Sequence, residues 1–113
     1  MFQENRKESR IGTHIIAEIE KEGGFHKHCG YIENLSKDGM GIISLEPFRP
    51  GETVISSFYL NEIPVKINSK ASLVHSEMGD CNLYYHGFKF DDLSEKDQRA
   101  IENFVKENQS YLI

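Results

Sequence analysis

Apolar and polar side chains alternate along most of the chain. Between Thr13 and Glu20, the apolar residues Ile15, Ala17 and Ile19 fall on one side, a period of two that is typical of a half-buried strand. Further strand-like runs cover residues 25–34, 40–45, 53–60, 63–67, 70–77 and 81–90. Short strands at roughly ten-residue spacing indicate an antiparallel barrel or sandwich.

The period changes near the C-terminal end of the chain. Ser94 has the position of a helix N-cap, with Asp97 three residues after it. Apolar residues then recur at helical spacing from Ile101 to Val105. We therefore expect a helix that ends near Asn108 and covers one opening of the barrel.

The charge distribution limits the kinds of ligand that the protein can bind. The formal net charge of −5 argues against general binding of nucleic-acid polymers, because such binding needs a broad basic surface. Positive charge is instead concentrated in Arg6, Lys7 and Arg10. This local cluster suits a small anion that binds at one place.

The sequence also suggests a cellular compartment. Its N-terminal end lacks the apolar core of a secretory signal, and no run of 18 apolar residues could span a membrane. We therefore expect a cytoplasmic protein. In that setting, Cys29 and Cys81 are expected to be reduced, buried or half-buried thiols rather than a disulfide.

Two short polar motifs carry the candidate chemistry. Arg6 and Arg10 lie four residues apart just before the first strand-like run, and planar guanidinium groups suit phosphates and guanine edges. Farther along, Asn34 offers an amide and Ser36 a hydroxyl, each able to donate and accept hydrogen bonds. Gly39 permits a positive φ or the close approach of a ligand. The same segment also has the composition of a simple hairpin turn.

The order and spacing of these motifs, Arg6-x-x-x-Arg10 and Asn34-x-Ser36-x-x-Gly39, resemble the PilZ family of receptors for the bacterial second messenger cyclic di-GMP (c-di-GMP). The resemblance continues through residues 48–54, 71–75 and 84–90, and so covers nearly the whole chain. It implies an all-β fold, a six-stranded antiparallel PilZ-like β-barrel with a C-terminal helix.

The resemblance also divides the chain into two parts. The barrel and helix would form a single domain over residues 13–113. Residues 1–12 contain only three apolar side chains, too few to anchor a folded element. We therefore expect these residues to form a mobile arm that carries the two arginines.

By the same resemblance, the protein would be a c-di-GMP-binding receptor or adaptor that changes conformation on binding and signals to a partner protein. Arg6 and Arg10 would bind phosphate oxygens and guanine O6 and N7. Asn34 would meet the polar edge of a guanine, and Ser36 would bond to phosphate or base. Gly39 would shape the turn and keep a side chain out of the pocket.

Three other positions and the residue type at position 34 refine this expectation. Lys7 could add charge to the site, and His75 could stack on a guanine, although a plain surface histidine explains it equally well. Asn5 stands where some relatives carry a further Arg and bind a stacked pair of ligands, so one ligand per chain is expected. Asn34 stands where many relatives have Asp. Compared with Asp, asparagine keeps the hydrogen bonding but lacks the negative charge.

Three alternatives remain open. A metal site could draw on His26, His28, Cys29, His75, Cys81 and His86, but these residues lack a recognised ligand spacing. The second alternative is an enzyme. No nucleophile elbow, phosphate loop or pair of catalytic carboxylates can be located, so we expect neither catalysis nor a cofactor. The third alternative is a PilZ-like protein-interaction module that binds no nucleotide, and the intact motifs argue against it.

Overall fold

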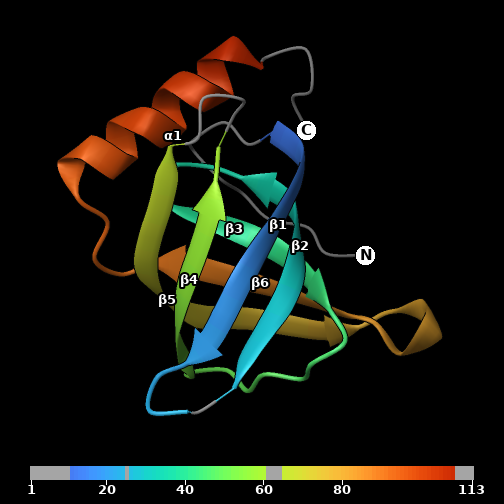
Figure 1. Cartoon of the computed structure of the whole chain (residues 1–113). Helices are drawn as coiled ribbons and strands as arrows, with labels where there is room; N and C mark the ends of the chain where they lie inside the picture. The colour runs from blue at the N-terminus through green and yellow to red at the C-terminus, as the bar shows by residue number, and fades with distance from the viewer. Residues whose placement is uncertain (1–10, 25, 61–64, 109–113) are drawn as a thin grey trace.

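The computed structural model describes residues 11–24, 26–60 and 65–108. Six strands form a closed barrel in the order β1-β2-β3-β6-β5-β4, and all neighbouring pairs are antiparallel (Figure 1). The elements are β1 (Ile11–Lys21), β2 (Lys27–Leu35), β3 (Gly39–Ser44), β4 (Thr53–Tyr59), β5 (Lys66–Met78), the short 3₁₀ helix η1 (Asp80–Asn82), β6 (Tyr84–Phe90) and α1 (Glu95–Glu107). The expected six-stranded antiparallel barrel with a C-terminal helix is confirmed.

The alternation of apolar residues decides which side chains fill the barrel. In β4, Val54 and Phe58 are buried. Ile55 and Tyr59, each the next residue along the strand, face outward. The ring of Phe58 stacks on that of Phe90 in β6, with centroids 6.4 Å apart. Such interdigitated aromatic and branched side chains make the interior a packed core rather than a pore.

Two strand boundaries differ from those expected. The runs 63–67 and 70–77 were expected to be separate strands, but β5 continues without a break from Lys66 to Met78. Residues 61–64 lie outside the described part of the chain. The last strand begins at Tyr84 rather than at residue 81, because Cys81 and Asn82 have φ values of 58° and 60° and so interrupt the extended backbone.

The two cysteines are not buried as expected. Cys29 and Cys81 are both exposed, and both are free thiols. Cys29 lies opposite Glu18 on the outer face of the barrel, where alternation turns its side chain away from the core. Cys81 lies in the exposed turn before β6. The expectation of burial was therefore wrong, because it came from residue type alone.

The C-terminal helix lies across one end of the barrel, at the top of Figure 1. The backbone N–H of Asp97 donates to the Ser94 hydroxyl at 3.1 Å, so Ser94 is the N-cap as predicted. Ile101 and Val105 are buried, and Asn108 ends the helix. Among the described residues, no helix is long and apolar enough to cross a membrane.

His86 is a polar side chain inside the barrel. Its Nε2 donates to the carbonyl of Glu46 at 2.8 Å, and its Nδ1 therefore accepts from the Ser76 hydroxyl at 3.0 Å. The ring also meets the edge of Phe48, with centroids 5.0 Å apart. Burial lowers the pKa of His86 below the ordinary value of 6.5. The imidazole is thus neutral, and it ties the loop after β3 to β6.

Truncating the helix face that packs on the barrel should destabilise the fold. Ile101 is fully buried, so Ile101→Ala removes apolar contacts and leaves a cavity. We expect the free energy of unfolding in urea to fall by about 2–4 kcal/mol. The matched variant Asn103→Ala changes an exposed position of the same helix and should cost less than about 0.5 kcal/mol. Equal losses in the two variants would show that the helix does not pack as described.

The buried histidine should make stability depend on pH. Between pH 6.5 and the lowered pKa of His86, the unfolded chain binds more protons than the folded chain. The free energy of unfolding should therefore fall as the pH is lowered through this interval. His86→Gln should reduce that slope, because glutamine does not titrate in this range. Urea unfolding at pH 7.5 and pH 5 checks this, and an undiminished slope in His86→Gln would contradict it.

Candidate functional site

Ser36 and Gly39 close the turn between β2 and β3. The Ser36 hydroxyl accepts hydrogen bonds from the backbone N–H groups of Asp38 and Gly39, both at 3.2 Å, and the Ser36 N–H donates to the Gly39 carbonyl at 2.9 Å. A Cβ on Gly39 would lie 2.3 Å from the carbonyl oxygen of Phe88. Gly39 is therefore required by the close approach of β6, and positive φ is not the reason for it. The second motif forms a tight turn.

Asn34 faces the outside of the barrel because of a bulge in β2. The pairing of β2 with β3 shifts between Ile32 and Asn34, and Asn34 then lies opposite Gly41. The neighbours of Gly41 in β3, Met40 and Ile42, are core residues, so alternation turns Gly41 outward. Asn34 shares that outer face, although its side chain is largely buried there.

Asn34 begins a row of four residues that crosses four strands of the outer face. In succession, Asn34 of β2 pairs with Gly41 of β3, Gly41 with Gly87 of β6, and Gly87 with His75 of β5. We call Asn34, Gly41, Gly87 and His75 the glycine row. A second bulge, in β5 after Leu73, turns His75 to this face. Gly41 and Gly87 place no side chain of their own between the polar side chains at the ends of the row.

Tyr85 lies two residues before Gly87 in β6 and contacts Asn34 of the glycine row. Its hydroxyl accepts a hydrogen bond from Asn34 Nδ2 at 3.3 Å. A Cβ on Gly41 would lie 2.3 Å from the Tyr85 hydroxyl oxygen and 2.7 Å from Asn34 Nδ2. The missing side chain of Gly41 therefore makes room for this contact. Tyr85 was not predicted as a site residue, since only the pairing of β2, β3 and β6 brings it to Asn34.

The chain enters the barrel beside the turn. β1 begins at Ile11, which pairs with Leu35, the residue before Ser36. The Tyr31 hydroxyl donates to the Thr13 carbonyl at 2.6 Å and so holds the start of β1. Arg6, Lys7 and Arg10 lie outside the described residues, as does the expected arm except for its last two positions. Covalent connection nevertheless joins Arg10 directly to Ile11.

His75 lies at the far end of the glycine row, close to a carboxylate. Its Nε2 is 3.6 Å from a carboxylate oxygen of Glu77, and Glu77 pairs across the strands with Tyr85. The imidazole is half-buried. The structure thus brings His75 to the same face as Asn34, while Ser36 and Gly39 lie in the adjoining turn.

The residues considered for a metal site do not gather. Among the described residues, no three His, Cys, Asp or Glu side chains lie close enough to hold an ion. His86 is held inside the barrel by Ser76 and Glu46, and Cys81 lies in an exposed turn. The metal alternative therefore draws no support from the described side chains.

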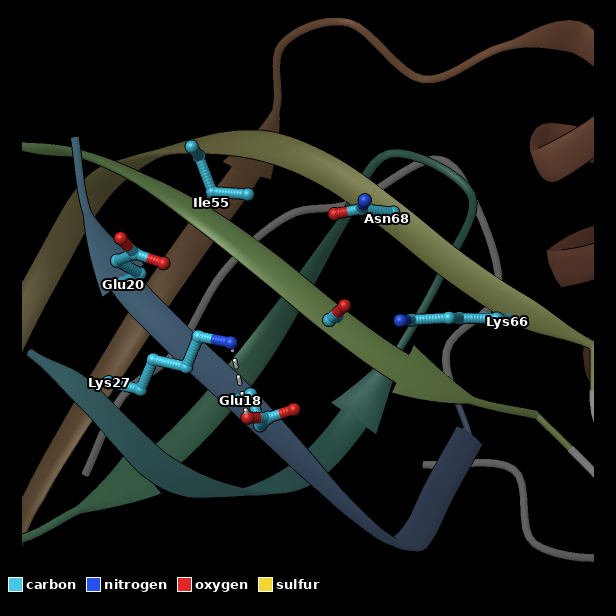
Figure 2. A pocket seen from close by; sticks show the side chains of 7 residues that line it. Glu18, Glu20, Lys27, Ile55, Lys66 and Asn68 are labelled. Carbon is cyan, nitrogen blue, oxygen red and sulfur yellow. Dashed lines mark ion pairs between the residues drawn. The ribbon is translucent and has the colours of Figure 1, made fainter.

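A separate hollow of about 210 Å³ lies on the outer face of β1, β4 and β5, with Lys27 at the start of β2 also lining it (Figure 2). Its lining residues are Glu18, Glu20, Lys27, Ile55, Ser57, Lys66 and Asn68. Lys27 and Glu18 form an ion pair there at 4.0 Å. The hollow is open and polar, and it shares no residue with the glycine row or the turn.

Solved structures show the same fold at low sequence identity. The Bacillus subtilis inhibitor of motility MotI/DgrA has a TM-score of 0.81 at 15% identity, with 96% of this chain and 53% of that chain covered. The PilZ domain of Escherichia coli YcgR with c-di-GMP has a TM-score of 0.74 at 14% identity, with 95% and 93% covered. The K. pneumoniae MrkH–c-di-GMP complex has a TM-score of 0.78 at 14% identity, with 93% and 52% covered.

The chain spans about half the length of MotI and MrkH, and nearly the whole of the YcgR domain. No curated protein matches the sequence. The family comparison is direct, because a model of the PilZ domain matches residues 4–107 and so includes both polar motifs. This chain therefore belongs to the PilZ domain family.

Proposed function

We propose that this protein is a c-di-GMP receptor that changes conformation on binding and signals to a partner protein. One observation carries the proposal. Asn34 faces outward beside the Ser36–Gly39 turn, at the end of the barrel where the segment with Arg6 and Arg10 joins β1. Both motifs of the family are therefore attached to one region of the surface.

The chemistry of this region suits a ligand with two phosphates and two guanines. Arg6 and Arg10 would bind phosphate oxygens and guanine O6 and N7, with Lys7 adding positive charge. Asn34 would bond to the polar edge of a guanine. Gly87 has no side chain that would hold a flat base away from the sheet, and His75, which pairs with it, would offer a ring against which the base can stack.

The free-energy cost of ordering the arm favours a conformational switch that depends on the ligand. Ordering the arm costs about 1–2 kcal/mol per residue fixed, whereas a hydrogen bond to a charged group contributes about 1.5–3 kcal/mol. Several arginine contacts are therefore needed at once, which links closure of the arm to ligand binding. The closed arm would present a changed surface to a partner protein.

The proposed receptor acts in the cytoplasm and is not a catalyst. The exposed free thiols of Cys29 and Cys81 suit a reducing compartment, where such thiols persist. The nucleotide is its ligand, and no catalytic step or cofactor is part of the proposal.

A second candidate function is a PilZ-like interaction module that binds no nucleotide. It is favoured by the buried hydroxyl of Ser36, which already bonds to the backbone of Asp38 and Gly39. These bonds give the second motif a structural role that needs no ligand. Arg6 and Arg10 are needed for the receptor function, because they bind the nucleotide, but the interaction module does not need them.

Calorimetric titration with c-di-GMP separates the two functions. We expect saturable binding of one ligand per wild-type chain and no binding of GTP. Arg10→Ala should weaken binding by about 10- to 100-fold, the value of one lost hydrogen bond between charged groups. The matched variant Arg99→Ala removes an exposed arginine on α1 and should bind like wild type. No binding of c-di-GMP by wild type would favour the interaction module.

Hydrogen exchange tests the closure of the arm. On addition of c-di-GMP, amides of residues 2–12 should exchange more slowly, because the arm becomes ordered against the barrel. Amides around the separate hollow, such as those of Ser57 and Asn68, should keep their rates. Binding without any added protection in residues 2–12 would rule out the switch.

A further inference from the structure

We propose that Lys89 is a further ligand-binding residue, whose ammonium group binds a phosphate of the cyclic dinucleotide from the outer face of β6. This inference rests on the proposed function, which it deepens. The barrel itself, and not only the segment with Arg6 and Arg10, would then supply positive charge to the site. The starting observation is that Lys89 pairs across the strands with Gly39, the last residue of the second motif.

Alternation along β6 turns Lys89 outward. Phe88 and Phe90, its two neighbours in the strand, are buried in the core, whereas Lys89 is exposed. Gly87 of the glycine row precedes Lys89 by two residues, about 7 Å along the strand, and lies on the same outer face. Lys89 therefore lies beside the glycine row, on the side where β3 begins at Gly39.

The residues that pair with Lys89 leave its ammonium group available. Gly39 on one side has no side chain, and Ser72 on the other side donates its hydroxyl to the carboxylate of Asp91 at 2.5 Å. Asp91, two residues after Lys89, is thus bonded to Ser72. Lys89 makes no ion pair with any carboxylate in the described part of the chain.

Lys89 also differs in charge from the strands around the glycine row. In β3 and β6, both fully described, Lys89 is the only charged side chain, because His86 is buried and neutral. A dinucleotide on this face brings two phosphates to a protein whose formal net charge is −5. An ammonium group on a flexible stem suits one of these phosphates as a compact point charge.

The position of Lys89 separates its role from that of the arginines. A strand of a closed barrel is already ordered, so a contact from Lys89 costs only the side-chain entropy of one lysine. Contacts from Arg6 and Arg10 require the arm to become ordered as well. Lys89 would therefore contribute to affinity through its charge, without any part in the closure of the arm.

The test is a series of charge changes at position 89 of the full chain, read out by calorimetric titration with c-di-GMP. Lys89→Gln should weaken binding by about 3- to 10-fold, between the values of an exposed ion pair and a charged hydrogen bond. Lys89→Glu should weaken it further, and Lys89→Arg should stay within about threefold of wild type, because the charge is kept. The loss in Lys89→Gln should be smaller at about 500 mM than at about 50 mM NaCl, because salt screens exposed charges.

Lys66→Gln is the matched control, because Lys66 is an exposed lysine of β5 that lines the separate hollow. It should bind like wild type, and all variants should unfold at the same urea concentration as wild type. Equal losses in Lys66→Gln and Lys89→Gln would overturn the inference, since net charge alone would then explain them. Unchanged affinity in both Lys89→Gln and Lys89→Glu would also overturn it while leaving the proposed function intact. Absence of binding by wild type would instead remove the proposed function, and the inference with it.

Discussion

The candidate site depends on the bulge in β2. A regular strand would alternate in and out through residues 32–35, and Asn34 would then point into the core with Ile32. The extra residue lets Ile32 and Leu35 both stay buried while Asn34 pairs with Gly41 on the outer face. A polar side chain is thereby turned to the outer face of the barrel without loss of apolar packing, and the strong local twist of a bulge suits the tight turn that follows.

The remaining features of the site follow from that placement. Once Asn34 faces outward opposite Gly41, the space beside this glycine admits the Tyr85 hydroxyl, and Gly87 continues the row to His75. A second bulge, in β5, turns His75 to the same side. Bulges are common beside functional sites because they redirect single side chains while the barrel stays intact. The surface is thus shaped by strand pairing, with few charged side chains from the barrel itself.

Local patterns in the sequence predicted most elements of the fold. Alternation indicated β1 and β4, and Ser94 with the apolar face around Ile101 indicated α1. The runs 63–67 and 70–77 were expected to be separate strands, yet β5 continues across Asn68 and Ser69, since Ser69 fits the interior as a small residue. The predicted burial of Cys29 was wrong, because residue type does not say which face of a strand a residue occupies.

Contacts between distant strands could not be predicted in this way. Asn34 and Ser36 were selected from their spacing, but their surroundings depend on register and bulges, which no short pattern reveals. Tyr85 and His86 were therefore missed as partners of Asn34 and Glu46, although both lie in a segment that was expected to be a strand. The pairing of β3 with β6, which the sequence alone does not reveal, places Tyr85 within hydrogen-bond distance of Asn34.

The central claim is that c-di-GMP binds across the glycine row, beside the turn that carries the second motif. Two-dimensional amide NMR of the labelled protein during titration with c-di-GMP tests this most directly. The account predicts large, saturable shifts for Gly41, Gly87 and the turn, with Ser57 and Asn68 at the separate hollow unmoved. Shifts confined to the hollow, or no saturable shifts at all, would contradict it.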